Sequence, residues 1–370
     1  MKIKDIKKAL ENAKGQKVKG NPLRRLCTLS TMIYSLLKTN HSRLTNLSKV
    51  ICPELDFQSR VKKLKRWVSN EYVDTEHFFL PFLAKILENL ATRKQILFAI
   101  DGSPVGNGCV CLMISLVWRK RAIPLCWLVR RGKKGHFPVE MHLQLLDIFS
   151  KLLPPDCKVT LLGDGEFSKI ELLEFCDIKG WDVVCRTAKN RLIRLDDKGE
   201  KIILGAYLYP EEGIETAWIP NVLYTNKKYG PIHVFCHHDS KHKDPWYLVS
   251  NIDYPPQVIR LYKKRFSIET LFGDLKSRGF NVHKSKLRAP DRVSRLLIAV
   301  CLAYIFTVLA GLNSKKIDLK TLKKICRQDQ PSHFSIFCIG KMLWDAYFEF
   351  HDFYSDIFKE LLLDLKSVRF

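Results

Sequence analysis

Between residues 96 and 188 the sequence alternates between short apolar runs and amphipathic stretches. In chain order these segments are QILFAID, CVCLMISLVW, RAIPLCWLV, VEMHLQLLDIFSKLL, KVTLLGD, SKIELLEFCDIKG and WDVVCRTA. Near-continuous apolar runs are typical of parallel strands that helices cover on both faces. Three strands followed by helix, strand, helix and strand indicate an α/β sheet.

Two of these apolar runs end in an aspartate, Asp101 and Asp164, and each is followed by a glycine. Asp-Gly after a strand is commonly just a turn. If the sheet is parallel at those two strands, however, both carboxylates lie at its centre, where a later helix can bring a third acidic group.

That later helix is predicted for the segment YKKRFSIETLFGDLK. At about 100° per residue, Tyr262, Arg265, Glu269 and Lys276 share an arc of about 60°. An apolar stripe lies beside them, and the predicted solvent face lies outside both. The apolar stripe is Leu261, Ile268, Leu271, Phe272 and Leu275, and the solvent face is Arg260, Lys263 and Asp274.

Asp101, Asp164 and Glu269 together predict a site of hard oxygen ligands. Such a site suits Mg²⁺, with Mn²⁺ as a substitute, rather than zinc. Two such ions about 4 Å apart can activate a water or a 3′-hydroxyl and stabilise the leaving oxygen of a phosphodiester. Tyr262, Arg265 and Lys276 would then position phosphates near the cut.

The net charge of +24 indicates a polyanionic partner, most often nucleic acid. Residues 1–95 carry 20 Lys and Arg against 8 Asp and Glu, a net of +12, and residues 256–295 carry 11 against 3, a net of +8. Three helices are predicted near the N-terminus: one opening at Asn21-Pro22, a second in SRLTNLSKVI, and a basic third in QSRVKKLKRWVSN. They suggest a helix-turn-helix-like DNA reader, and an amphipathic helix with a solvated basic face is an equal alternative. The DNA-contacting candidates are Lys62, Lys63, Lys65 and Arg66.

The spacing Y-x2-R-x3-E-x6-K resembles the signature of the bacterial insertion-sequence transposases of the DDE type. IDGSPV around Asp101 and LLGDGEF around Asp164 resemble the two aspartate motifs of that family, and RKRAIPLCW with KKGHFP resembles the segment between them. The resemblance covers roughly residues 95–310. One departure is Asp164-Gly165-Glu166-Phe167, where members of the family often have Asp-Arg-Gly-Phe, so a basic neighbour is replaced by a carboxylate.

The resemblance implies an α/β, ribonuclease H-like catalytic core with a β-strand insertion, and the N-terminal helices suggest a preceding all-α DNA-binding domain. It also implies metal-dependent phosphodiester hydrolysis and strand transfer in cut-and-paste transposition, with Mg²⁺ as cofactor. The partners would be transposon ends and target DNA, held by a homodimer in a bacterial, nucleoid-associated location. The expected divisions are 1–95 (helical, DNA-binding), 96–188 (core), 189–255 (β-rich insertion), 256–312 (core) and 313–370 (helical tail).

Three alternatives remain open at this stage: a catalytically inactive, DNA-binding relative, a nuclease that cuts without joining, and a membrane protein. The last rests on the 17 uncharged residues from Leu296 to Leu312, at the bottom of the length that spans a bilayer. We expect a buried core helix there. The opening residues lack the apolar core of a signal peptide, so we expect a cytoplasmic protein without membrane attachment.

Some smaller groups of residues carry weaker predictions. A zinc site in residues 233–242 matches no common spacing, so an ordinary strand and polar loop is favoured. His136 could contact DNA, and Trp218 and Trp246 could stack on an unpaired base, although core packing is the default for both tryptophans. The zinc candidates are His233, Cys236, His237, His238 and His242.

Overall fold

The fold was analysed in a computed structural model that describes residues 3–15, 18–90, 95–118, 120–133, 135, 137–240 and 243–350. Residues 3–90 are helical wherever they have regular structure. The helices are α1 (Ile3–Lys14), α2 (Gly20–Thr39), α3 (Leu44–Leu47), α4 (Phe57–Val68), α5 (Thr75–Phe78) and α6 (Leu80–Leu90), with a 3-10 turn at Ser48–Val50. Helices therefore lie at all three places where the sequence predicts them.

Ten strands form one continuous sheet in the order β3-β2-β1-β4-β5-β10-β9-β8-β6-β7. The strands β1, β2 and β3 are antiparallel neighbours, whereas β4 is parallel to both β1 and β5. The first five strands are β1 (Ile96–Gly106), β2 (Cys109–Trp118), β3 (Arg121–Arg131), β4 (Val159–Gly163) and β5 (Asp182–Arg186). This half of the sheet has the strands and the parallel pairing that the sequence predicts.

The first strand is longer than its apolar run. Residues Gly102 to Gly106 continue pairing with β2, so that Gly102 lies opposite Leu112 and Gly106 opposite Cys109. The expectation that Asp101 ends a strand is therefore wrong. The parallel pairing of β1 with β4 does stop at Ala99, so Asp101 lies just beyond the point where these two strands part.

The second half of the sheet is built by residues 189–255. Its strands are β6 (Leu192–Arg194), β7 (Ile202–Ile203), β8 (Thr216–Tyr224), β9 (Tyr229–His237) and β10 (Trp246–Ser250). The antiparallel pair of β10 with β5 joins this inserted segment to the first half. The predicted β-rich insertion is not strand throughout, because the helix α9 (Leu204–Tyr207) directly follows β7. There the backbone N–H of Gly205 donates to the carbonyl of Lys189 (2.7 Å) and folds the chain back.

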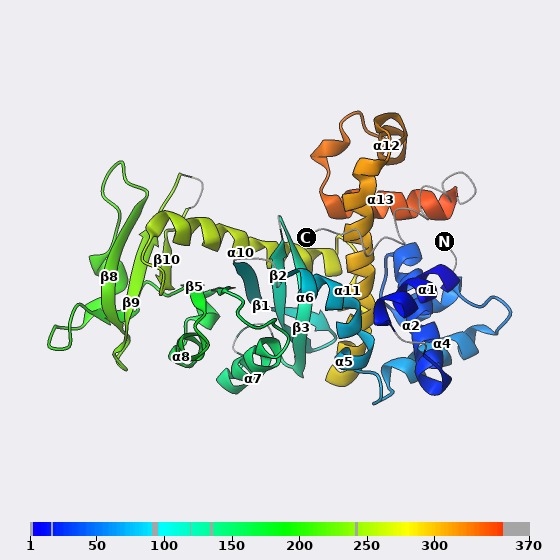
Figure 1. Cartoon of the computed structure of the whole chain (residues 1–370), viewed down its shortest axis with the longest axis horizontal. Coiled ribbons are helices and arrows are strands. Elements are labelled where there is room, and N and C mark those ends of the chain that lie inside the picture. The colour runs from blue at the N-terminus through cyan, green and yellow to red at the C-terminus, as the bar shows by residue number, and fades with distance from the viewer. Residues whose placement is uncertain are drawn as a thin grey trace.

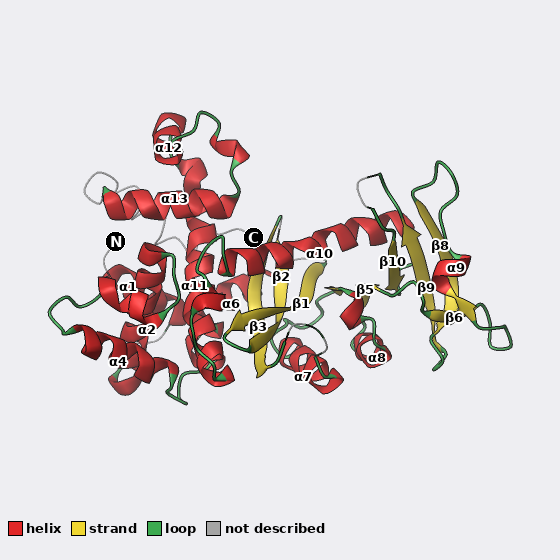
Figure 2. Ribbon diagram, turned by 180° about the vertical axis from the view of Figure 1, so that it is seen from behind, coloured by secondary structure: helices red, strands yellow, loops and turns green. Residues whose placement is uncertain are grey.

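Helices cover the first half of the sheet on both faces (Figures 1 and 2). The helices α7 (Val139–Ser150) and α8 (Ile170–Ile178) lie on one face, and α10 (Pro255–Leu275) crosses the other. Prolines occupy the first two positions of α10, where their missing N–H groups have no helical partner in any case. The helix that carries Glu269 therefore lies across the strands that carry Asp101 and Asp164.

The long helix α11 (Pro290–Asn313) joins the sheet to the N-terminal helices. It packs against β3, α2 and α4, and α13 (Ile336–Glu349) packs on it. The segment Pro290–Lys316 is long and apolar enough to cross a membrane, but 89% of its most apolar window is buried inside the molecule. The predicted buried core helix is thus confirmed.

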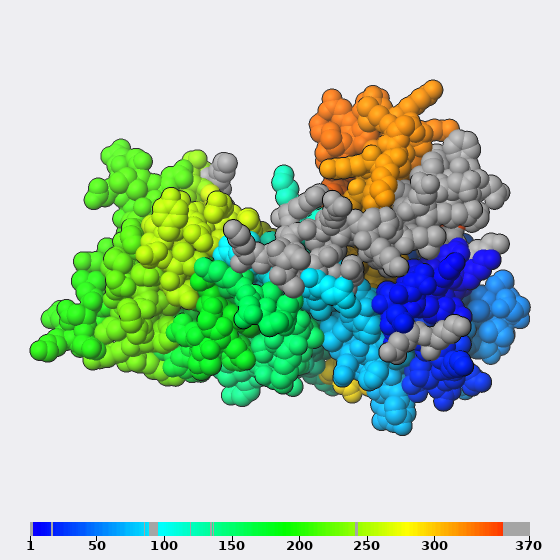
Figure 3. All heavy atoms as spheres, in the orientation of Figure 1, coloured from blue at the N-terminus to red at the C-terminus, as the bar shows by residue number. Residues whose placement is uncertain are grey.

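The chain beyond α11 forms a separate prominence. The helix α12 (Leu319–Cys326) stands beside α13, and in the space-filling view of Figure 3 this orange region rises above the rest of the surface. The last part of the predicted helical tail, residues 351–370, lies outside the described residues.

Candidate active site

The register of β1 and β4 brings the two aspartates level with each other. Ala99 pairs with Leu162; Asp101 lies two residues further along β1, and Asp164 directly follows the last residue of β4 in an extended conformation. Neighbouring strands are about 4.8 Å apart, and residues two apart in a strand point to the same face. Phe98 packs on Phe149 of α7, with ring centroids 4.4 Å apart. Asp101 is three residues further along β1, so its side chain points to the opposite face of the sheet, which α10 covers.

Glu269 approaches the two aspartates from α10 through Arg265. An Nη2–H group of Arg265 donates to Oε1 of Glu269 (2.5 Å), and Nη1 of the same guanidinium lies 4.0 Å from Oδ2 of Asp101. The Arg265 side chain is only 6% exposed, whereas that of Glu269 is 50% exposed. The crossing helix therefore brings Glu269 to the same buried guanidinium that lies beside Asp101.

The electrostatics of Asp101 reflect this crowding of acids. Burial and, after it, the neighbouring carboxylates of Asp164 and Glu269 together raise the pKa of Asp101 to about 6, against the opposing effects of the backbone N–H of Gly102 and the charge of Arg265. Burying like charges together disfavours ionisation unless a cation compensates them. The site thus carries more acid than its own arginine neutralises.

Tyr262 and Arg265 form the wall of the site rather than its exposed rim. Tyr262 is 1% exposed, and its ring packs on Trp246 and Phe266. The guanidinium of Arg265 lies 4.6 Å from the ring centre of Phe266. Trp246 is therefore a core residue, as its default interpretation predicts. Lys276 is half-buried just after the last residue of α10, with its Nζ 5.8 Å from the ring centre of Phe272.

The predicted solvent face of α10 is wrong at Asp274. Arg260 and Lys263 are exposed, but Asp274 is 2% exposed and accepts from Nη1 of Arg121 (2.6 Å) and Nε of Arg278 (2.9 Å). Arg121 begins β3 and reaches the helix from the sheet. A helical wheel gives the direction of a side chain but not the element that approaches it, so the sequence contained no signal for this pair.

The three carboxylates supply only oxygen ligands, and Glu269 is turned to Arg265. Within the described ranges, no three Asp, Glu, His or Cys side chains are grouped closely enough to hold a metal ion as they stand. The excess of negative charge and the all-oxygen donor set nonetheless fit a hard divalent cation. Asp101, Asp164 and Glu269 are the residues that would hold it.

Glu166, the departure from the family motif, has a structural partner that the sequence did not reveal. Its Oε1 accepts from the backbone N–H of Phe137 (2.5 Å) and lies 3.4 Å from Nε2 of the buried His142. Burial would raise the pKa of Glu166, but the nearby His142 ring and the N–H of Phe137 outweigh it, so that this pKa is lowered. Phe137 fills the space beside Gly102, where any Cβ would lie 2.2 Å from its ring. Glu166 therefore anchors the chain segment that packs behind both aspartates.

The basic residues of α4 line a groove shared with α2. Lys62, Lys63 and Arg66 lie in it, whereas Lys65 is exposed outside it. Arg24 and Arg25 of α2 complete the groove, and the sequence analysis missed both. Nε1–H of Trp67 donates to the carbonyl of Arg25 (2.9 Å), which fixes the two helices together. No Asp or Glu lines this groove in the described part of the chain, so it is a candidate surface for a polyanion.

Among the described residues, the zinc candidates do not form a metal site. Nδ1 of His237 lies 2.8 Å from Oγ1 of Thr216, and Nδ1 of His238 lies 2.7 Å from the hydroxyl of Tyr209, so these rings have separate partners. His233 and Cys236 lie on the same strand, whereas His136 and His242 lie outside the described residues. Trp218 is 37% exposed and stacks on Phe235.

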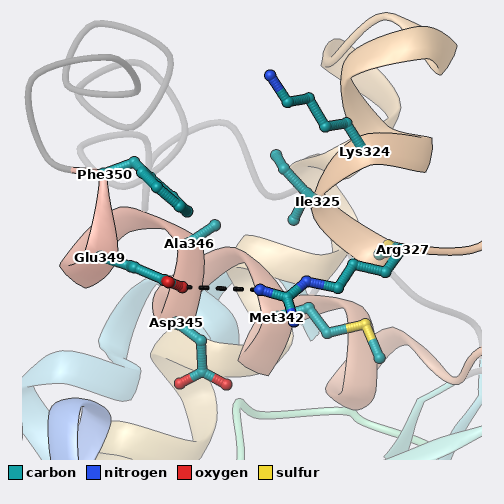
Figure 4. Close-up of a pocket in the computed structure, with 9 residues that line it drawn as sticks. Lys324, Ile325, Arg327, Met342, Asp345, Ala346, Glu349 and Phe350 are labelled. Atoms are coloured by element: carbon teal, nitrogen blue, oxygen red, sulfur yellow. Dashed lines mark ion pairs between the residues drawn. The ribbon is translucent and has the colours of Figure 1, made fainter.

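A further pocket lies between α12 and α13 and has mixed charge (Figure 4). Nη2 of Arg327 is 4.0 Å from Oε2 of Glu349, and Asp345 lies beside them. Because acids and bases line it together, this pocket lacks the uniform positive charge of the α2–α4 groove.

A family model described as a transposase DDE domain matches residues 106–306. This span is 201 of the 370 residues. The chain belongs to the DDE transposase family. Domains of this family generally use divalent metal ions. The matched span contains Asp164 and Glu269, and Asp101 lies five residues before it.

The other comparisons add little to the family assignment. No curated protein matches the chain. A cryo-EM structure of the piggyBac transposase synaptic complex with hairpin DNA is similar at a TM-score of 0.47 and 13% identity, covering 98% of this chain and 82% of that one. The predicted DDE transposase class is thus confirmed, while the bacterial insertion-sequence signature remains a prediction.

Proposed function

We propose that this protein is a cut-and-paste DNA transposase that hydrolyses and rejoins phosphodiester bonds at the ends of an insertion sequence. The observation that carries the proposal is the convergence of Asp101, Asp164 and Glu269 from two strands and a crossing helix. The order of antiparallel and parallel strands supports a ribonuclease H-like core. The uninterrupted run of helices before β1 supports a DNA-binding role for residues 1–95.

The cofactor proposed for this site is Mg²⁺, which Mn²⁺ can replace. When bound, such ions activate a water or a 3′-hydroxyl and stabilise the leaving oxygen of the phosphodiester. Asp101 and Asp164 are fixed by neighbouring strands and supply oxygen ligands from a rigid sheet. The side chain of Glu269 is half-exposed, so its carboxylate can leave Arg265 and bind the metal ion instead.

The chain's own cations would bind the DNA around the cut. Arg265, once released by Glu269, presents a planar set of donors that matches a phosphate. Lys276 supplies a point charge roughly 10 Å further along the helix axis, since it lies seven residues after Glu269. The partners proposed are transposon ends and target DNA, and a homodimer would hold the two ends together.

The decisive experiment measures cleavage of a labelled DNA fragment that carries the repeats flanking the gene. We expect Asp101→Asn, Asp164→Asn and Glu269→Gln each to abolish Mg²⁺-dependent cleavage while leaving DNA binding nearly unchanged, since shape is kept and charge is lost. Near-normal cleavage by one variant would remove that residue from the site. Binding without cleavage by the wild type would favour the inactive relative, and cleavage without strand-transfer products would favour a nuclease.

A second test concerns the α2–α4 groove. Neutralising Lys62, Lys63, Lys65 and Arg66 together should weaken DNA binding and flatten its salt dependence. Each lost phosphate contact reduces the slope of log K against log salt by about 0.9. An unchanged slope would mean that α4 is an amphipathic helix whose basic face is merely solvated, which is the alternative given in the sequence analysis.

A further inference from the structure

A second basic groove lies where three distant parts of the chain meet. Its cavity of about 610 Å³ is bounded by the turn after α2, the turn between β1 and β2, and the segment that joins α10 to α11. The residues that line it are His41, Arg43, Gly106, Asn107, His283, Lys284, Lys286 and Arg288. We call it the junction groove.

Two hydrogen bonds to backbone carbonyls hold the three parts of the junction groove in place. The side-chain Nδ2–H of Asn281 donates to the carbonyl of Asn40 (3.2 Å), which ties the α10–α11 segment to the N-terminal helices. The backbone N–H of Asn107 donates to the carbonyl of Leu287 (2.9 Å), which ties the same segment to the β1–β2 turn. The groove is therefore a fixed feature of the packed molecule.

The same contacts turn the basic side chains outward. Ser285 is buried and Leu287 is half-buried, whereas Lys284, Lys286 and Arg288 are exposed. Lys286 takes a left-handed backbone conformation (φ 62°), which is unusual for a residue with a side chain. A segment that merely needed solubility would not require this alternation, so we infer that the three cations are presented for a ligand.

The charge of the junction groove has one sign. Four permanent cations line it, and no Asp or Glu does so among the residues the structure describes. Burial lowers the pKa of His41, and the nearby charges of Lys284 and Arg43 lower it further. Burial and Lys284 likewise lower the pKa of His283. Burial is the larger cause of both shifts, and the neighbouring positive charges add to it.

The histidines add directional donors to that charge. The backbone N–H of Arg43 donates to Nδ1 of His41 (3.0 Å), so a neutral His41 ring carries its proton on Nε2. Donors beside permanent cations suit phosphate oxygens, which accept several hydrogen bonds at once. The ligand chemistry that fits is therefore a run of phosphates rather than a single small anion, because the cations come from separated points around a wide groove.

The junction groove continues the line of α10 beyond the carboxylates. Lys276 follows the last residue of α10, and its charge contributes to the lowered pKa of His283. The backbone N–H of Asn281 donates to the carbonyl of Lys276 (2.7 Å), so the chain turns directly from the helix into the groove. A DNA strand with its scissile phosphate near Glu269 would pass Lys276 and then reach this surface.

We propose that the junction groove binds the phosphate backbone of the DNA a few nucleotides from the cleavage point, without reading its sequence. The inference rests on the proposed function, because it takes DNA as the ligand and places the cut at the three carboxylates. Residues from the N-terminal helices and from the sheet both line the junction groove. The groove therefore binds DNA only when the N-terminal helices are docked on the sheet.

The test uses the full-length protein and a fluorescent DNA duplex in EDTA, so that cleavage plays no part. Lys284→Ala/Lys286→Ala removes two exposed lysines of the groove. Lys315→Ala/Lys320→Ala removes two exposed lysines outside it and is the matched control. We expect the groove variant to lose roughly 10- to 30-fold in affinity at physiological salt and about 1.8 from its salt slope, at 0.9 per phosphate contact. The control should keep both values.

Equal salt slopes for the two variants, with DNA binding by the wild type intact, would overturn the junction groove and leave the proposed function standing. Failure of the wild type to bind DNA at all would overturn both. Thermal unfolding of each variant checks the fold. Should the alanine pair be unstable, Lys284→Gln/Lys286→Gln gives the same charge loss with longer side chains, and the same slope criterion then decides.

Discussion

The helix α10 takes part in two clusters of arginine and carboxylate that differ in their balance of charge. Asp274 is one acid held by two arginines, Arg121 and Arg278. Nine residues earlier on the same helix, Arg265 is one arginine among Glu269, Asp101 and Asp164. The first cluster has two arginines for one acid, although burial still raises the pKa of Asp274, whereas the second has one arginine for three acids. This difference separates a structural ion pair from the pair at the proposed metal site on the same helix.

The exposure of the two clusters follows the same division. The side chains of Arg121 and Asp274 are 7% and 3% exposed, so their pair is closed to solvent. In the pair of Arg265 and Glu269, the arginine is buried and the glutamate is half-exposed. Only the glutamate side chain can therefore move away from its partner without disturbing the core. We call Arg121–Asp274 the closed pair, whose role is structural. We call Arg265 with Glu269, Asp101 and Asp164 the open cluster, because its exposed glutamate can change partners.

The largest effect is expected from breaking the closed pair. Arg121→Met leaves Asp274 buried with only Arg278, and removing one partner of a buried pair costs about 3–5 kcal/mol. We expect a loss of roughly 3 kcal/mol in the free energy of unfolding, unaffected by Mg²⁺. Chemical denaturation with and without Mg²⁺ measures it.

The double variant Arg121→Met/Asp274→Leu is the control for this prediction. Replacing both partners by apolar groups is often neutral, so most of the lost stability should return. If the double variant is as unstable as Arg121→Met, the effect comes from packing of the Arg121 stem rather than from the unpaired carboxylate.

A smaller and more selective effect is expected at the open cluster. Arg265→Ala and Lys276→Ala should keep the fold and metal binding, yet slow double-strand release more than the first nick. In the resembled family this stripe handles the transposon end after nicking, including a DNA hairpin. Loss of a charge-assisted hydrogen bond of about 1.5–3 kcal/mol corresponds to roughly 10- to 100-fold in rate.

A time course of nicked, hairpin and released products on a labelled end separates these steps. Equal slowing of every step would assign Arg265 and Lys276 to general support of the site. No slowing would assign them to ordinary pairing on the surface, where ion pairs contribute only about 0–1 kcal/mol.

The sequence predicts the cluster around Arg265 but not the one around Asp274. The convergence of Asp101, Asp164 and Glu269 was predicted, because strand order and helical spacing are local patterns that a parallel sheet brings together. The burial of Asp274 was not, since Arg121 lies more than 150 residues away and no periodicity links them.

Long-range packing also explains the other omissions. His41 and Lys284 meet in the junction groove only through the docking of the N-terminal helices on the sheet. Glu166 was noticed as a departure from the family motif, but its partner, the N–H of Phe137, is a backbone group that carries no sequence signal. Contacts of this kind are visible only in the folded molecule.

The smallest effect is expected from removing one acid of the open cluster in the absence of metal. The pKa of Asp101 is raised to about 6 by burial and by Asp164, against about 3.9 for an unperturbed aspartate. The folded state therefore favours the protonated acid. Its contribution to stability is fully present below pH 4 and is lost as pH rises through 6.

Asp101→Asn cannot ionise and avoids that loss, and its remaining oxygen can still accept from the N–H of Gly102, as Oδ1 does in the wild type (2.7 Å). We expect the variant to be more stable than the wild type by about 1–2 kcal/mol at pH 8 in EDTA, below the ceiling of roughly 3 kcal/mol that the pKa shift sets. The advantage should vanish near pH 4. Thermal unfolding across this pH range measures it.

Mg²⁺ provides the internal control, because a bound cation stabilises the ionised wild type and has fewer ligands in Asp101→Asn. Adding Mg²⁺ at pH 8 should therefore raise the unfolding temperature of the wild type more than that of the variant, and the Arg121→Met protein should respond as the wild type does. A variant that is less stable than the wild type at every pH would mean that Asp101 is already neutralised by Arg265. The open cluster would then be as saturated as the closed one, and the contrast between them would fail.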